Sequence, residues 1–141
     1  MKRAVFLDRD GVINRAVVRD GKPHPPESAD VLEIIDGVGG ALERLRVAGY
    51  LLIVVTNQPD VARGKQSRQT IELMHAQLLD RLPLDEILPC YHDGDSCECR
   101  KPKPGALIGA ADRLQLDLTR SFTVGDRWRD IEAGQRAGCR T

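Results

Sequence analysis

Aromatic residues make up only 4% of this 141-residue sequence, and no apolar run approaches the roughly 20 residues that a membrane-spanning helix needs. An excess of charge of one sign is also missing, because 21 Lys and Arg balance 21 Asp and Glu. This balance favours neither nucleic acid nor a membrane surface as the main partner, while leaving room for a local positive pocket. Apolar residues at 41% and charged residues at 30% are typical of a globular protein, and we expect residues 1–141 to form one domain.

The N-terminus lacks the apolar core of a signal peptide. Lys2 and Arg3 are followed by only four apolar residues before Asp8. The cysteines are also few and are not spread like a disulfide framework, because three of the four lie within ten residues, at positions 90, 97 and 99. We therefore expect a cytoplasmic protein whose clustered cysteines bind a metal rather than form disulfides.

Strand-like and helix-like segments alternate along the chain. Apolar runs predict strands, and apolar residues at helical spacing predict helices between them. The pattern indicates a Rossmann-like α/β fold, a parallel sheet flanked by helices. Residues 14–36 are polar and carry three prolines, so we expect a flap there and no large cap domain. The expected strands cover residues 3–7, 51–55, 87–91 and 121–124. The expected helices lie near residues 41–48, 67–82 and 104–114, and a last helix runs through Ile131 and Ala137 and ends near Gly138.

Chemically unusual residues follow each expected strand. Ligands bind beyond the carboxyl ends of parallel strands, so these residues are expected to share one site. The four groups are Asp8-Arg9-Asp10-Gly11, Thr56-Asn57-Gln58, Arg100-Lys101 beyond a cysteine-rich loop, and Gly125-Asp126-Arg127 with Asp130 one turn later.

Phosphoryl transfer requires a nucleophile, a divalent cation, donors to the phosphate oxygens and an acid for the leaving group. A carboxylate, here Asp8 or Asp10, can act as the nucleophile, and converging carboxylates call for a hard cation such as Mg²⁺. Thr56 and Asn57 supply neutral donors, and Lys101 supplies a positive charge. Each feature alone has a simpler interpretation, such as a helix cap for Asp126 or turn chemistry for Thr56-Asn57, but their common position favours catalysis.

The four groups resemble the signatures of the haloacid dehalogenase superfamily of phosphatases. They read DRDGVIN at 8–14, TN at 56–57, Lys101 within RKPKPG, and GDRWRD at 125–130. The resemblance implies that Asp8 is the nucleophile and Asp10 the general acid and base. It also implies that the transferring phosphoryl group is contacted by Thr56, Asn57 and Lys101. Mg²⁺ would be bound by Asp8, Asp126 and the backbone carbonyl of Asp10, and Asp130 would support the metal site.

A closer resemblance connects the chain with the heptose 1,7-bisphosphate and histidinol-phosphate phosphatases of this superfamily. It rests on TNQ-x-x-x-ARG at 56–64 and CRKPKPG at 99–105. It implies a small phosphorylated substrate, a sugar bisphosphate or alternatively histidinol phosphate or another monoester, bound by Gln58, Arg63, Arg100 and Arg127. Pro59 and Asp60 depart from the family pattern, and the Asp60 carboxylate would disfavour a second phosphate.

Cys90, His92, Cys97 and Cys99 read C-x-H-x4-C-x-C. Three thiolates and one imidazole suit a structural, tetrahedral Zn²⁺ site, although reduced loop cysteines beside an incidental histidine are the simpler alternative. The loop, residues 90–100, leads directly into Lys101, so bound zinc would order it without taking part in chemistry.

Two other classes of protein fit parts of the pattern. A catalytically inactive zinc-organised binding module would not need the intact acidic groups, and a response-regulator receiver would carry its aspartate on the third strand. A monomer or small oligomer is expected. We expect His75 to be partly exposed on its helix, and Trp128 either to pack at the site edge or to stack on substrate.

Overall fold

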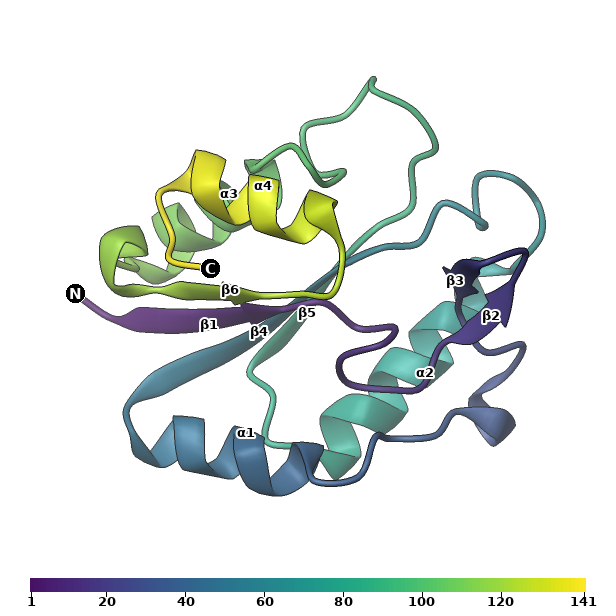
Figure 1. Cartoon of the computed structure of the whole chain (residues 1–141), viewed down its shortest axis with the longest axis horizontal. Helices are drawn as coiled ribbons and strands as arrows, with labels where there is room; N and C mark the ends of the chain where they lie inside the picture. Colours follow the sequence, from purple (N-terminus) through teal and green to yellow (C-terminus); the bar gives the residue numbers. More distant parts are fainter.

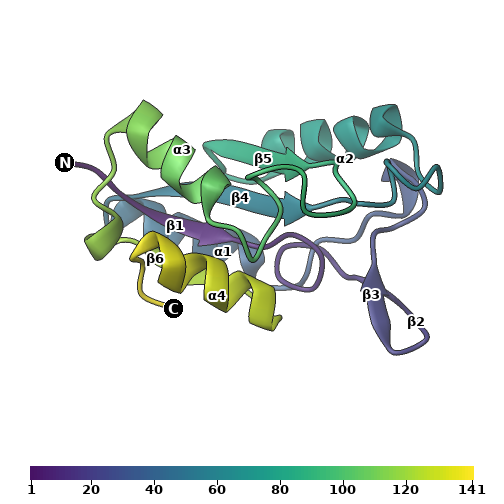
Figure 2. The same ribbon diagram turned by 90° about the horizontal axis from the view of Figure 1, so that it is seen from above.

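The computed structural model describes residues 1–141 and contains a parallel sheet of four strands in the order β5-β4-β1-β6. Helices α1 and α2 cover one face of the sheet, and α3 and α4 cover the other (Figures 1 and 2). The predicted Rossmann-like α/β fold is confirmed. The strands are β1 (Arg3–Leu7), β4 (Tyr50–Asn57), β5 (Glu86–Cys90) and β6 (Phe122–Val124), and the helices are α1 (Val38–Val47), α2 (Arg68–Arg81), α3 (Gly105–Leu114) and α4 (Trp128–Ala137).

The central strand β1 is apolar from Ala4 to Leu7, where both of its faces are buried. Successive side chains of a strand point to opposite faces. Val5 and Leu7 therefore join the core beneath α1 and α2, whereas Ala4 and Phe6 join the core beneath α3 and α4. Packing on both faces holds β1 between β4 and β6. The residues that follow β1 therefore emerge between these two strands, at the carboxyl end of the sheet.

The helix boundaries follow the capping signals in the sequence. The Ser67 hydroxyl accepts a hydrogen bond from the Thr70 amide at 3.1 Å and begins α2, as predicted. Gly138, with a φ of 90°, ends α4 in the left-handed region that glycine adopts most readily. The longest helix, α2, has 14 residues, and none of the helices combines the length and hydropathy that crossing a bilayer requires.

The predicted flap contains a small antiparallel hairpin, β2 (Val17–Arg19) and β3 (Lys22–His24), followed by the 3-10 helix η1 (Ala29–Val31). The hairpin lies at the carboxyl end of the sheet (Figure 1). Gln66 belongs to the loop between β4 and α2, and its side-chain amide donates to the Pro26 carbonyl of the flap at 2.9 Å. This hydrogen bond joins the flap to that loop. A second 3-10 helix, η2 (Leu118–Arg120), precedes β6, and no large cap domain is present.

The expectation for His75 was wrong. This side chain on α2 is only 7% exposed, because it packs against the fully buried guanidinium of Arg9. The helical pattern of α2 places His75 beside the apolar face, and the partner that makes its burial favourable comes from the end of β1.

Candidate active site

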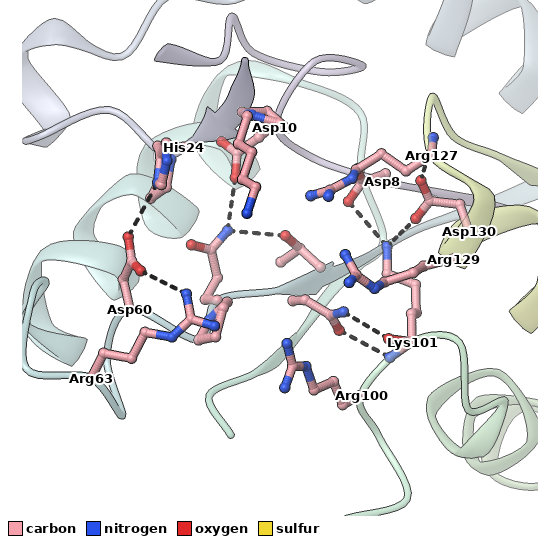
Figure 3. A pocket seen from close by; sticks show the side chains of 17 residues that line it. Asp8, Asp10, His24, Asp60, Arg63, Arg100, Lys101, Arg127, Arg129 and Asp130 are labelled. Atoms are coloured by element: carbon pink, nitrogen blue, oxygen red, sulfur yellow. Dashed lines mark hydrogen bonds and ion pairs between the residues drawn. The ribbon is translucent and has the colours of Figure 1, made fainter. Parts of the chain in front are cut away.

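The Lys101 ammonium lies where the predicted groups converge. Its Nζ donates to Asp8 Oδ1 at 3.0 Å and to Asp130 Oδ1 at 2.6 Å (Figure 3). The same nitrogen donates to the Val55 carbonyl at 2.6 Å. Lys101 is 4% exposed and Asp130 is 3% exposed, and buried charges of this kind require such partners. One side chain therefore connects the ends of β1 and β4 with the first turn of α4.

Three carboxylates gather beside this ammonium. Carboxylate oxygens of Asp8, Asp126 and Asp130 all lie within 4.8 Å of one another. Burial raises the pKa of Asp8, the charge of Lys101 opposes that rise, and the charge of Asp130 adds to it. The Mg²⁺ implied by the sequence fits here, because hard oxygen ligands converge and their mutual repulsion favours a cation.

A glycine allows the loop after β1 to lie against one of these carboxylates. Gly11 has a φ of 90°, and a Cβ atom at this position would lie 2.5 Å from Asp126 Oδ2. Only glycine avoids both the backbone strain and this overlap. The DRDG turn and Asp126 are therefore fitted to each other, as a shared ion site requires.

The Asp10 carboxylate is held by three neighbouring side chains. Its Oδ1 accepts from Arg9 Nη2 at 2.8 Å and from Asn14 Nδ2 at 3.0 Å, and its Oδ2 accepts from Gln58 Nε2 at 3.0 Å. Arg9 is completely buried and also contacts His75. The sequence motif identified Asp10, but the role of its neighbour Arg9 was not recognised.

The residues after β4 support the site from within. Asn57 accepts from the Lys101 amide and donates to the Lys101 carbonyl, both at 3.0 Å, which leaves one of its amide hydrogens for a ligand. Gln58 is 1% exposed and donates to both Asp10 and Thr56, each at 3.0 Å. Gln58, predicted to bind substrate, thus uses its two amide hydrogens to orient groups of the protein.

A polar cleft of about 240 Å³ opens above these residues, and none of the 17 residues that line it is hydrophobic. Arg63 donates to Asp93 twice at 2.9 Å, and Arg100 donates to the same carboxylate at 3.3 Å. Asp93 belongs to the cysteine loop, so this loop sets the position of both arginines. Asp60 lies 3.5 Å from Arg63, whose positive charge partly offsets that of the Asp60 carboxylate. Asp60 also lies 3.8 Å from His24 of the flap.

Two further arginines in the cleft have no carboxylate within ion-pair distance, Arg127 and Arg129. Burial lowers the pKa of Arg129, and the charges of Arg127 and Arg100 lower it further. Arg129 also lies over the Trp128 ring, with Cζ 5.2 Å from the ring centroid. Trp128 is 60% exposed and is not among the residues that line the cleft. Arg129 was not identified from the sequence, and clustered unpaired guanidinium groups favour an anionic ligand.

The cysteine loop brings its four predicted ligands together. Cys90 Sγ lies 3.7 Å from Cys97 Sγ and 2.7 Å from Cys99 Sγ, and His92 Nδ1 lies 3.4 Å from Cys90 Sγ and from Cys99 Sγ. Ligands that share a tetrahedral zinc ion at about 2.3 Å are separated by about 3.8 Å, so a bound ion would hold Cys90 and Cys99 further apart. Burial raises the pKa of Cys90 and of Cys99. Burial acts in the same direction on Cys97, but hydrogen bonds, of which the one from the Arg100 amide has the largest effect, lower the pKa of Cys97 to about 7. The donor set fits zinc.

This fold and this constellation of residues define the class of the protein. The sequence pattern of the haloacid dehalogenase-like hydrolases matches residues 24–138. The chain belongs to this family.

Particular relatives lie within one branch of it. The chain is 42% identical to the D-glycero-beta-D-manno-heptose-1,7-bisphosphate 7-phosphatase of Pasteurella multocida, over 97% of this chain and 78% of that protein. It is 41% identical to the enzyme of the same name from Escherichia coli K12, over 98% and 76%. The crystal structure of D,D-heptose 1,7-bisphosphate phosphatase from B. bronchiseptica, complexed with magnesium and phosphate, superposes with a TM-score of 0.81 at 35% identity, over 97% and 77%.

Proposed function

We propose that this chain is a Mg²⁺-dependent phosphatase that removes one phosphoryl group from a sugar bisphosphate through an aspartyl-phosphate on Asp8. One observation carries the proposal: Asp8 is held by Lys101 at the base of a polar, arginine-rimmed cleft, beside two more carboxylates. A buried nucleophile, a fixed positive charge and a set of metal ligands at one point are the parts that phosphoryl transfer uses.

The reaction then proceeds in two displacements. An Asp8 carboxylate oxygen bonds to phosphorus while the bond from phosphorus to the leaving oxygen breaks, and Asp10 gives that oxygen a proton. Water next bonds to phosphorus and gives a proton to Asp10 as the bond to Asp8 breaks, which releases phosphate. Bound at Asp8, Asp126 and the Asp10 carbonyl, with Asp130 in support, Mg²⁺ would neutralise charge on the phosphoryl oxygens.

Thr56 and Asn57 line the cleft beside this reaction centre. We assign both to the oxygens of the transferring group. Lys101 stays within reach of Asp8 throughout and offsets negative charge as it develops, in an environment from which bulk water is largely excluded.

The rim favours a bisphosphate over histidinol phosphate, the second candidate. Arg127 and Arg129 have no carboxylate within ion-pair distance, so a second anionic group would relieve their mutual repulsion. Histidinol phosphate would instead bring a cationic amine toward them. The relatives at 42% and 41% identity, both named for a heptose 1,7-bisphosphate, support the same assignment.

The inactive binding module is disfavoured because Lys101 contacts Asp8 and Asp10 lines the same cleft. None of the four cysteines is in a disulfide. Zinc coordination requires these thiols to be reduced, which supports a cytoplasmic setting.

The nucleophile is tested by Asp8→Asn. The amide preserves shape but cannot form the aspartyl-phosphate, so we expect kcat with heptose 1,7-bisphosphate to fall on the order of 10⁴-fold or more. The matched control Asp112→Asn alters an exposed carboxylate on α3 and should retain full activity. Phosphate release is measured with Mg²⁺ and with EDTA, and wild-type activity should disappear with EDTA. Near-normal turnover of Asp8→Asn would refute the assignment.

The second-anion subsite is tested by Arg129→Ala. We expect KM for heptose 1,7-bisphosphate to rise roughly 10- to 100-fold through loss of a charge-assisted hydrogen bond, with little change for a heptose monophosphate. Arg136→Ala, on the exposed side of the same helix, is the control. Trp128 is the only tryptophan, so the tryptophan fluorescence reports on this residue alone. Because Arg129 lies over its ring, this fluorescence should change when the bisphosphate binds to the Asp8→Asn protein. An equal rise in both KM values would contradict the subsite.

The zinc site is tested by Cys97→Ser. Loss of one thiolate should remove bound zinc, measured by elemental analysis, and lower activity because Arg100 and Lys101 lose their ordered loop. Cys139→Ala, at the buried cysteine outside the cluster, should keep a single zinc ion per chain. Purified wild-type protein that is free of zinc yet fully active would show that the loop needs no metal.

A further inference from the structure

The two oxygens of the Asp10 carboxylate have unequal surroundings. Oδ1 accepts three hydrogen bonds, from Arg9 Nη2 at 2.8 Å, Arg9 Nε at 3.3 Å and Asn14 Nδ2 at 3.0 Å. Oδ2 accepts one, from Gln58 Nε2 at 3.0 Å. An oxygen that already accepts three donors has no lone pair left for a proton, whereas Oδ2 has one. A proton on Asp10 therefore resides on Oδ2.

Arg9 is itself fixed from behind by His75. Arg9 is completely buried, and its Nη1 lies 3.0 Å from His75 Nε2. Since a guanidinium group only donates, Nε2 must accept, and the ring carries its hydrogen on Nδ1. Burial, and then the charge of Arg9, lower the pKa of His75 to about 4, while the charge of Asp10 acts weakly in the opposite sense. The ring is consequently neutral near pH 7 and keeps this lone pair.

A buried arginine can serve stability alone, but the directions of these bonds indicate more. None of the Arg9 side-chain nitrogens donates to a backbone carbonyl. Two of them point at Asp10 and the third points at His75. The guanidinium is thus a rigid planar connector between a helix core position and one oxygen of Asp10.

We propose that Arg9 and His75 are positioning residues that reserve Asp10 Oδ2 for proton transfer. This inference rests on the proposed phosphatase function. The Oδ2 proton passes to the leaving oxygen as its bond to phosphorus breaks, and a proton returns to Oδ2 from the attacking water. Arg9 occupies Oδ1 throughout, and His75 prevents the guanidinium from rotating away.

The test compares His75→Leu, which cannot accept from Arg9, with His75→Gln, whose side-chain oxygen can. Each variant is assayed with a sugar phosphate, whose alkoxide must be protonated as it leaves, and with p-nitrophenyl phosphate, whose leaving group needs little help. We expect His75→Leu to lower kcat/KM for the sugar phosphate roughly tenfold or more and to leave kcat/KM for p-nitrophenyl phosphate nearly unchanged, because kcat/KM reports the first displacement, in which only the sugar alkoxide needs the Oδ2 proton. His75→Gln should restore the sugar phosphate activity.

Met74→Leu is the control for packing, because it alters the adjacent buried side chain of the same helix and conserves volume. If His75→Leu does not fold, Arg9→Lys replaces it, since one ammonium cannot contact both partners, and the same selective loss is expected. An equal loss of kcat/KM on both substrates, or no recovery in His75→Gln, would overturn the positioning role. A wild-type protein that releases phosphate from neither compound would overturn the proposed function itself.

Discussion

A single buried ammonium organises the structure around the site. Lys101 contacts the carboxylates of Asp8 and Asp130 and the carbonyl of Val55, so it joins the middle of the sheet to α4. Without it, two carboxylates would face each other in a region that is largely closed to water, which is unfavourable by several kcal/mol. The parallel sheet brings these groups to one edge, and Lys101 makes their closeness possible.

Charge changes sign across the cleft. Acidic groups gather at its base beside Lys101, where a cation is favoured, and arginines line its rim, where an anion is favoured. Asp93 of the cysteine loop holds Arg63 and Arg100, while Arg127 and Arg129 remain unpaired. A substrate with one phosphate at the base and a second anionic group at the rim would complement both regions.

Simple chemical signals in the sequence predicted much of this arrangement. The predicted strand at residues 3–7 has the same bounds as β1. The tendency of ligands to bind beyond the carboxyl ends of parallel strands predicted that Asp8, Lys101 and Asp130 share one site, and the three side chains are in contact. The burial of His75 was missed because helical spacing gives the direction of a side chain but not its partner, which lies 66 residues away. Arg129 was missed for a similar reason: a charged residue in a first helical turn is ordinarily exposed, and only the fold turns it toward the cleft.

The proposed chemistry depends most directly on Lys101, so the decisive measurement is kcat of Lys101→Met with heptose 1,7-bisphosphate at saturating Mg²⁺, with circular dichroism to confirm the fold. The expected result is a folded protein whose kcat has fallen on the order of 10²- to 10³-fold, because the fixed charge beside Asp8 is gone. A folded variant with kcat close to that of the wild type would contradict the central role of this ammonium.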